Sequence, residues 1–269
     1  MIRNVLSIAG SDPSGGAGIQ ADLKTFAARG VYGMAVVTAL TAQNTQGVSG
    51  VEAVSPGFVA DQIEAIFEDV RVDAVKIGMI ADAAIARAVA EVLSARPTVP
   101  IALDPVMVAK GGSALLAPDA VKVLTTRLLP LAAMLTPNLP EAAALLGEPV
   151  AADRAGMAAQ AMRLRALGPA AVLVKGGHLE GEGSPDVLAT ADGLEWFEAK
   201  RIPTRNTHGT GCTLSSAIAA ELAKGASPLE AVRTAKTYLA GAIAAADQLS
   251  VGSSHGPVHH FHALWRDEP

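Results

Sequence analysis

The amino-acid sequence predicts an α/β fold in which a mostly parallel sheet is covered by helices on both faces. Short apolar runs with strand character alternate with longer runs of helical periodicity along the whole chain, and this is the order that β–α–β units produce. Half of the 269 residues are hydrophobic and only 17% are charged, so the chain can bury a large core. Aromatic residues make up 3%, and we therefore expect an aliphatic core.

The alternation begins with an apolar strand from Arg3 to Ala9, a glycine-rich turn and a helix over residues 19–29. The other expected strands cover residues 32–41, 48–54, 74–78, 101–103, 133–135, 171–174, 186–190 and 195–199. The other expected helices cover residues 56–69, 82–95 with Asp82 as N-cap, 118 onward, 139–146, 155–167, 210–224 and 228–246. Asp192-Gly193 is typical of a hairpin turn. Neither a repeat nor a linker interrupts the series, so we expect one domain over residues 1–269.

In sheets of this kind, ligands bind beyond the carboxyl ends of the strands. That rule selects the residues that follow the expected strands as candidates for a binding site. They are Gly10–Gly18, Gln43, Gly78-Met79, Asp104, Asn138, Lys175 and the loop around Gly209.

The loop Asn-Thr-His-Gly-Thr-Gly-Cys at residues 206–212 runs directly into a helix. Gly209 and Gly211 allow consecutive backbone N–H groups to turn toward one point, and the helix N-terminus adds partial positive charge. We therefore expect a phosphate cradle here. Cys212 lies in the first helical turn, where a thiol is expected to become more acidic. The alternative is an ordinary glycine-rich loop before a core helix.

Composition excludes several function classes. The net charge of −5 argues against a nucleic-acid surface, which needs clustered Lys and Arg. The single cysteine fits a reducing cytoplasm, and no apolar run reaches membrane-spanning length. Gly10 is followed by Ser-Asp-Pro, and this spacing disfavours a dinucleotide-binding dehydrogenase. We expect a cytoplasmic protein that binds neither nucleic acid nor a membrane.

Polar residues at and just after the later strand ends are candidates for holding phosphate or metal. Asn138 and Glu141 form Asn-x-x-Glu at a helix start, where they either cap the helix or hold a hydrated Mg²⁺ with phosphate oxygens. Asp104 is either a turn residue before a proline or a second carboxylate near the metal and the phosphates. Lys175 ends a buried strand, where a cation needs a partner that a nucleotide phosphate would supply.

Other polar residues are candidates for contacts with a ligand. The Gln43 amide complements the edge of an aminopyrimidine. Asp22, in the first helix, either accepts a hydrogen bond from a ligand or is a solvated helix acid. We expect His208 to shape its loop or to touch a nucleotide, in preference to a role in proton transfer. A metal site in the C-terminal tail is disfavoured, because no cysteine accompanies its histidines, which are His255, His259, His260 and His262.

Seven motifs together resemble the bacterial hydroxymethylpyrimidine/phosphomethylpyrimidine kinases, a family within the ribokinase-like superfamily. The longest is Ala-Gly-Ser-Asp-Pro-Ser-Gly-Gly-Ala-Gly-Ile-Gln-Ala-Asp at residues 9–22. The others are Thr-Ala-Gln-Asn-Thr (41–45), Lys-Ile-Gly-Met (76–79), Asp-Pro-Val-Met (104–107), Thr-Pro-Asn-Leu-x-Glu (136–141), Val-Lys-Gly-Gly-His (174–178) and His-Gly-Thr-Gly-Cys (208–212). The resemblance covers nearly the whole chain.

The resemblance implies a ribokinase-like three-layer α/β/α sandwich and two successive phosphoryl transfers from ATP, with Mg²⁺, in thiamine biosynthesis. The first product is 4-amino-5-hydroxymethyl-2-methylpyrimidine phosphate and the second is its diphosphate. The residues that it places at the pyrimidine are Gln43, Ala17, Gly18, Asp22, Met79 and Val106. Those that it places at Mg-ATP are Lys175, Asn138, Glu141, Asp104, Thr207 and His208, with Asp104 and Glu141 near the metal through water. Those that it places at the transferring phosphate are Gly209, Thr210, Gly211 and Cys212.

Most ribokinase-like enzymes have Gly-x-Gly-Asp where this chain has Gly-Thr-Gly-Cys, and their aspartate is the general base. We hypothesise that Cys212 acts as base in the first transfer. The acceptor of the second transfer is already an ionised phosphate, which a nearby carboxylate would repel and a neutral thiol would tolerate.

Two other functions stay open at this point. One is a pyridoxal kinase of the same superfamily, and the other is a non-catalytic pyrimidine-binding protein. We also expect a homodimer, formed through apolar surface near residues 31–54, and a loop at residues 108–116 that closes over the site.

Overall fold

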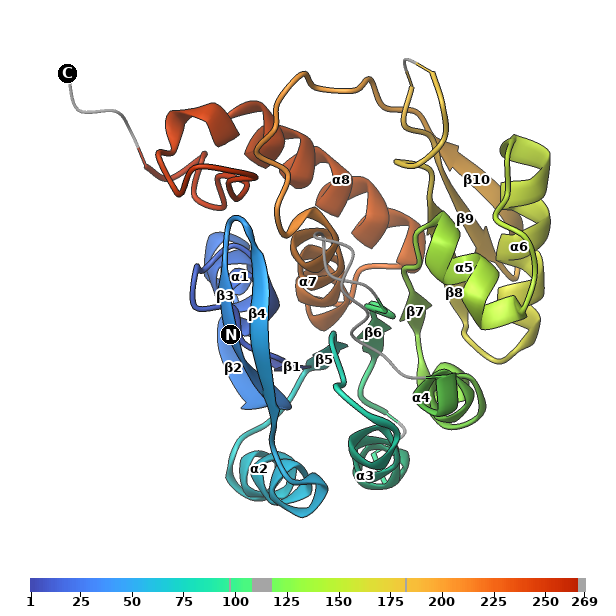
Figure 1. Ribbon diagram of the computed structural model, residues 1–269. Helices are drawn as coiled ribbons and strands as arrows, with labels where there is room; N and C mark the ends of the chain where they lie inside the picture. The colour runs from blue at the N-terminus through green and yellow to red at the C-terminus, as the bar shows by residue number, and fades with distance from the viewer. Residues whose placement is uncertain (97, 108–117, 182, 266–269) are drawn as a thin grey trace.

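The computed structural model describes residues 1–96, 98–107, 118–181 and 183–265. Its centre is an eight-stranded sheet (Figure 1). In spatial order the strands are β10 (Gly193–Phe197), β9 (Asp186–Thr190), β8 (Ala171–Lys175), β7 (Met134–Leu135), β6 (Ile101–Leu103), β5 (Ala74–Ile77), β1 (Asn4–Ala9) and β2 (Tyr32–Val37). Every neighbouring pair from β8 to β2 is parallel, whereas β9 pairs antiparallel with both β8 and β10. The predicted mostly parallel sheet is confirmed.

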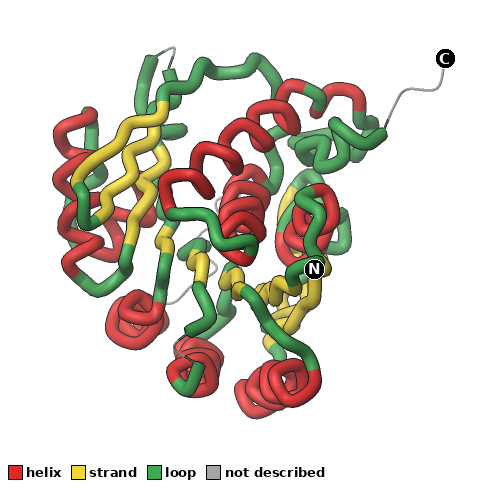
Figure 2. The backbone as a smooth tube through the Cα atoms, turned by 180° about the vertical axis from the view of Figure 1, so that it is seen from behind, coloured by secondary structure: helices red, strands yellow, loops and turns green. Residues whose placement is uncertain are grey.

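Helices cover both faces of the sheet. One face carries α2 (Pro56–Asp69), α3 (Ala83–Ser94), α4 (Pro118–Val123), α5 (Leu139–Leu146) and α6 (Arg154–Ala166). The other carries α1 (Gly18–Ala28), α7 (Thr210–Ala223) and α8 (Pro228–Ala244). Figures 1 and 2 show α7 in the middle of that second face, with α1 and α8 on either side. Short helical turns cover Leu124–Leu128, Leu129–Leu131 and Ala246–Gln248.

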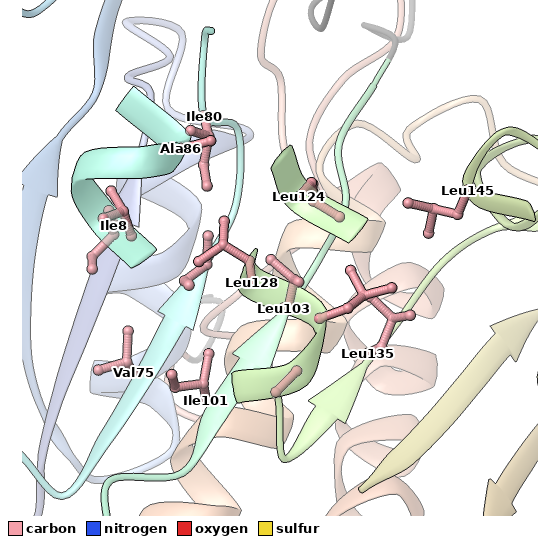
Figure 3. Packing of buried hydrophobic residues seen from close by; sticks show 14 of the residues in the cluster. Ile8, Val75, Ile80, Ala86, Ile101, Leu103, Leu124, Leu128, Leu135 and Leu145 are labelled. Carbon is pink, nitrogen blue, oxygen red and sulfur yellow. The ribbon is translucent and has the colours of Figure 1, made fainter. Parts of the chain in front are cut away.

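Two aliphatic clusters hold these layers together, and strand alternation assigns side chains to them. On β1, Leu6 and Ile8 pack into the cluster under α2 to α6, whereas Val5 packs under α1 and α7. Figure 3 shows the first cluster, in which Val75 and Leu103 from neighbouring strands meet side chains of the covering helices. Among the described residues, we find no helix with the length and apolar character needed to cross a lipid bilayer.

The expected strand over residues 32–41 is wrong as a single element. It is divided at Thr38, a buried residue whose hydroxyl donates to the Met79 carbonyl at 2.7 Å. After this break, β3 (Ala39–Asn44) leaves the main sheet and pairs antiparallel with β4 (Gly47–Ala53). Figure 1 shows the two strands of this hairpin, β3 and β4, at the left of the view. The division matters because it carries Gln43 away from the sheet and toward the loops at the strand ends.

The expected helix caps are confirmed where the structure tests them. The Asp82 carboxylate accepts from the N–H groups of Ala84 and Ile85, at 2.8 Å each. Each such cap satisfies amides that would otherwise have no partner in the first helical turn.

Candidate active site

Two glycine-rich loops meet at the carboxyl end of the sheet. They are the turn after β1 and the loop before α7. Gly209 has a left-handed φ of 78°, and a Cβ built on it would lie 1.8 Å from the Gly16 carbonyl oxygen. The loops therefore approach at a distance that only glycine permits. The expected phosphate loop is built jointly with residues that lie almost two hundred positions earlier in the chain.

Asp12 joins the two loops, and sequence reasoning did not single it out. Its carboxylate accepts from the N–H of Ala17 at 2.8 Å and contacts Nε2 of His208 at 2.8 Å. Burial raises the pKa of Asp12, but its bonds to His208 and Ser14 lower it by more, so the net pKa is lowered. An acidic residue inside a glycine-rich turn, able to accept from several loop amides, is the sequence signal that could have identified it.

His208 lies on the side of the loop that faces the hairpin. Besides its bond to Asp12, its Nε2 lies 3.4 Å from Nε2 of Gln43. These contacts show that His208 shapes the loop, and its contact with a nucleotide stays a prediction. They also bring Gln43 to the loop before α7, so the expected pyrimidine residue and the expected phosphate cradle share one face of the molecule.

The N-terminus of α7 points into a cluster of charge. Gly209 is its N-cap residue, and as a glycine it offers no side-chain cap to the first amides of the helix. A Cβ built on Gly211 would lie 3.4 Å from Oδ2 of Asp104 and 3.5 Å from Nζ of Lys175. Available amides, a helix dipole and a lysine thus converge on one point, which is an arrangement that binds phosphate.

Lys175 and Asp104 form a buried ion pair, with Nζ 3.0 Å from Oδ1. Thr136 also donates to Oδ1 of Asp104, at 3.2 Å. Burial lowers the pKa of the Lys175 ammonium, but the carboxylates of Asp104 and Glu141 raise it by more, so the net pKa is raised. The lysine therefore keeps its charge next to the α7 N-terminus, and its partner in this structure is Asp104.

Asn138 and Glu141 form the capping box that the Asn-x-x-Glu pattern predicts. The Asn138 side chain accepts from the Glu141 N–H at 2.9 Å, and the Glu141 carboxylate accepts from the Asn138 N–H at 2.8 Å. Burial raises the pKa of Glu141 to about 7, against the opposing effect of Lys175. Because burial makes the Glu141 carboxyl group costly to ionise, a cation bound nearby would favour its ionised form.

We expect Glu141→Gln to stabilise the protein at pH 8 and to have little effect at pH 5. The folded-state pKa of about 7 exceeds the ordinary value of 4.5, so the folded chain holds a proton that the unfolded chain loses between these values. Stability therefore falls as the pH rises through this window, by at most about 3 kcal/mol. Glutamine keeps the capping box and removes the charge. Thermal unfolding of both proteins across pH 5–8 measures the difference.

Glu230 offers a matched control, because it closes a second capping box with Ser227 on α8 and its pKa is lowered by the Ser227 hydroxyl. Its ionised form stabilises the folded chain above pH 4.5, so Glu230→Gln should not raise the melting temperature at pH 8. Equal responses of the two variants would contradict the role of burial at Glu141.

The expectation of an acidic thiol at Cys212 is wrong. Burial raises the pKa of the Cys212 thiol to about 11, and the Lys76 ammonium opposes this only in part. The Gly18 N–H is hydrogen-bonded to the sulfur. Burial thus outweighs the position in the first turn of α7, and the thiol is neutral at physiological pH.

Asp22 is not the solvated helix acid considered from sequence, because its side chain has no exposed surface. Lys76 contacts both of its carboxylate oxygens at 2.9 Å, and the hydroxyls of Ser7 and Ser216 each donate to it at 2.6 Å. In this structure the carboxylate is enclosed behind Cys212, and the placement of Asp22 at the pyrimidine stays a prediction. Lys76 was missed, although a lysine inside an apolar strand signals a buried partner.

The remaining candidates lie in the two glycine-rich loops or just after strands β5 and β6. The Ala17 and Gly18 N–H groups are bonded to Asp12 and Cys212. Met79 is buried, with its methyl group directed at Gly10, and Val106 is half-buried. The Thr207 carbonyl accepts from the N–H of Thr210, at 3.5 Å. The loop expected to close over the site, residues 108–116, lies outside the described residues.

Comparison with known proteins agrees with this geometry. The phosphomethylpyrimidine kinase family matches residues 12–259. The hydroxymethylpyrimidine/phosphomethylpyrimidine kinase of Escherichia coli (strain K12) is 55% identical over 262 residues, which are 97% of this chain and 98% of that protein. The protein of the same name from Rhizobium meliloti (strain 1021) is 56% identical over 267 residues, 99% and 100% of the two chains.

Solved structures give the same result for the fold. An ADP complex of Bacillus subtilis pyridoxal kinase superposes with a TM-score of 0.91 at 37% identity, over 99% of this chain and 100% of that chain. The phosphomethylpyrimidine kinase of Clostridium difficile 630 gives 0.80 at 44% identity, over 90% and 99% of the two chains. The extent of these matches leaves one assignment: the chain belongs to the phosphomethylpyrimidine kinase family.

Proposed function

We propose that this protein is an ATP-dependent kinase that phosphorylates 4-amino-5-hydroxymethyl-2-methylpyrimidine and then phosphorylates the monophosphate to the diphosphate, in thiamine biosynthesis. The observation that carries the assignment is the position of Gln43. Its Nε2 lies 3.4 Å from Nε2 of His208, which belongs to the loop that leads into α7. An aromatic ring held by Gln43 would present its substituent to the amides at Gly211. Lys175 lies at the same point and would hold the phosphate being transferred.

In the first transfer, the substrate hydroxyl oxygen bonds to the γ-phosphorus of ATP while the bond from that phosphorus to the β–γ bridging oxygen breaks. The hydroxyl proton passes to solvent, and ADP leaves. In the second, a phosphate oxygen of the monophosphate makes the attack. This chemistry depends mainly on positioning and charge stabilisation. The amides of Gly209 to Cys212 and the Lys175 ammonium supply both. A neutral Cys212 thiol suits the second transfer, and its predicted role as base in the first would require the thiolate.

We propose Mg²⁺ as the accompanying metal, held through water by Glu141 and Asp104. Among the described residues, no group of three or more His, Cys, Asp or Glu side chains is placed to hold a metal ion. Mg²⁺ fits a site made of two carboxylates, because it keeps several waters and binds through one or two carboxylates together with substrate phosphates. Bound Mg²⁺ would neutralise phosphate charge. Titration with Mg²⁺ and a nucleotide at pH 8 should raise the melting temperature of the wild type more than that of Glu141→Gln.

Product analysis with hydroxymethylpyrimidine and Mg-ATP tests the assignment. Chromatography should resolve the monophosphate first and the diphosphate later, with one ADP released for each transfer. A monophosphate that never proceeds to diphosphate would contradict the second activity. Absence of ADP release with any candidate alcohol would favour the non-catalytic pyrimidine-binding alternative.

Pyridoxal phosphorylation is the second candidate function, because pyridoxal kinases are among the similar solved structures. The kinase of Staphylococcus aureus in complex with AMP-PCP and pyridoxal superposes with a TM-score of 0.89 at 32% identity, over 98% of this chain and 95% of that chain. The aldehyde of pyridoxal could trap Cys212 as a hemithioacetal. An absorbance change on mixing, absent in Cys212→Ala, would support this activity.

We expect Gln43→Ala to raise KM for the pyrimidine by about tenfold to a hundredfold while leaving KM for ATP nearly unchanged. The substitution removes the amide that pairs with the ring and leaves polar ring atoms unsatisfied. Gln46→Ala is the control, because Gln46 lies in the same hairpin and its exposed side chain donates to Ser253. A similar change in both variants would argue that the hairpin, and not the amide, is responsible.

We also propose that the enzyme works in the cytoplasm as a homodimer. Leu40 on β3 and Val51 on β4 are large apolar side chains that are 55% and 48% exposed. The pairing of Leu40 with Glu52 and of Thr41 with Val51 puts the two side chains on opposite faces of the hairpin, and a second copy packed on the Leu40 face would remove Leu40 from water. Light scattering at micromolar concentration should give twice the mass of the chain, and Leu40→Lys should shift it toward the monomer.

A further inference from the structure

A buried charge cluster lies directly behind Cys212. Lys76 on β5 and Asp22 on α1 have fully buried side chains, and the ammonium contacts both carboxylate oxygens at 2.9 Å. Ser7 and Ser216 complete the carboxylate shell with bonds of 2.6 Å each. The two phosphoryl transfers described above require no contact between substrate and this cluster.

Helical spacing sets the distance between the cluster and the thiol. Cys212 and Ser216 are four residues apart on α7, and Gly18 and Asp22 are four apart on α1, so each pair occupies one helix face. The Gly18 N–H bonds to the Cys212 sulfur, and Ser216 bonds to Asp22. The two helices thus face each other in register, and Asp22 lies one turn behind the thiol.

The sheet places Lys76 on the same side. Ser7 and Lys76 are directly opposite each other in the parallel pairing of β1 and β5. Their sequence neighbours, including Ile8 and Ile77, pack against the helices of the other face. Because side chains alternate along a strand, Ser7 and Lys76 face α1 and α7.

Four charged groups act on the Cys212 thiol. Lys76 and Asp22 form one ion pair, and Lys175 and Asp104 form the other, with Nζ 3.0 Å from Oδ1. Each cation is therefore already matched by a carboxylate. Burial lowers the pKa of Lys76, but the carboxylates of Asp22 and Asp104 raise it, and the net pKa is raised, so Lys76 is charged.

We propose that Asp22 and Lys76 are positioning residues of this kinase, in which Asp22 is the counter-ion that keeps the Lys76 ammonium from ionising Cys212. A buried ammonium requires an anion. If Asp22 could not supply the charge, Cys212 would be the nearby group left to form an anion, because Asp104 is engaged by Lys175. The thiol proton would then go to solvent, and a thiolate would stand where the second acceptor brings its phosphate. This last consequence rests on the proposed function.

Alkylation of Cys212 by iodoacetamide tests the proposal, because the chain contains a single cysteine. Mass spectrometry follows the reaction from pH 6 to pH 10 without substrate. Asp22→Asn should accelerate alkylation at pH 7.5 at least tenfold and move its pH profile to lower pH. The double variant Asp22→Asn/Lys76→Met, which lacks both charges, should return to the wild-type rate or below it. Lys76→Met alone should react more slowly than the wild type.

Arg29→Met provides a control for the loss of a partly buried ion pair between the same helices. Arg29 follows α1, and its guanidinium lies 2.7 Å from the carboxylate of Glu221 on α7. This variant should lower the melting temperature and leave the alkylation profile unchanged. An Asp22→Asn profile equal to that of the wild type, or a double variant that reacts as fast as Asp22→Asn, would overturn the proposal.

The kinase reaction gives a separate measurement. Asp22→Asn should reduce kcat for the second transfer at least tenfold more than kcat for the first. A shifted alkylation profile in a protein that transfers no phosphoryl group would support the charge assignment and overturn the proposed function. A kinase whose thiol profile is the same in every variant would overturn the charge assignment and leave the function standing.

Discussion

Replacing Cys212 with aspartate is expected to slow the second phosphoryl transfer by about a thousandfold, with a change of less than about tenfold in the first. Two unit charges about 4 Å apart repel by roughly 4 kcal/mol at an effective dielectric constant of about 20, and every 1.36 kcal/mol is about a tenfold change in rate. The hydroxymethyl acceptor carries no charge, whereas the monophosphate is an anion. Separate single-turnover measurements with the two acceptors give the two rates.

Cys212→Ala is the companion to this experiment. It removes the thiol and adds no charge, so it should not slow the second transfer in the way that Cys212→Asp does, and a selective loss of the first transfer would support the base hypothesis. Equal losses of both transfers in Cys212→Asp would contradict the charge argument. A first transfer that survives in Cys212→Ala would argue against the hypothesis that the thiol is a base, as its raised pKa of about 11 already suggests.

Replacing Gly209 with alanine is expected to lower kcat of both transfers by about a hundredfold or more and to lower the melting temperature. The new Cβ would lie 1.8 Å from the Gly16 carbonyl oxygen, and both partners are backbone atoms that cannot rotate away. The left-handed φ of 78° adds strain of about 1–2 kcal/mol. The amides at Gly211 would be displaced from the phosphate, and the loss of such preorganised donors costs about 10²–10³ in kcat.

Gly225, just after the other end of α7, isolates the contribution of the close approach. Its φ of 90° is also left-handed, but no atom of the described part of the chain lies within 4 Å of a Cβ built on it. Gly225→Ala should therefore lose only the conformational strain, about 1–2 kcal/mol, and keep both rates. If Gly209→Ala retained wild-type rates and lost no more stability than Gly225→Ala, the two-loop cradle would not be needed for catalysis.

Much of the architecture is visible in local sequence patterns. Apolar runs bounded by glycine and proline predicted the strands, and Leu139–Leu146 and Asp186–Thr190 have the predicted bounds. Capping chemistry at Asp82 and Asn138 was also predictable, because a cap depends on residues two or three positions away. The rule that ligands bind at strand ends brought Asp104, Lys175 and the loop before α7 into one candidate site, and the structure places these residues together.

The division of residues 32–41 at Thr38 could not be predicted in this way. An apolar strand that leaves one sheet and enters another has the same alternation throughout, and the break depends on the Met79 carbonyl, forty-one positions further along the chain.

The sequence by itself determined the alternating α/β order, the glycine-rich phosphate loop and the family motifs, because these depend on neighbours within a few residues. Only the tertiary structure decided the charge states at the centre of the site. The Cys212 thiol is neutral and the Asp22 carboxylate is enclosed because α1, β5 and α7 pack together, and the bond from Ser216 to Asp22 joins residues 194 positions apart. Burial and the pairing of charges depend on such distant neighbours, and a pattern of nearby residues carries no information about them.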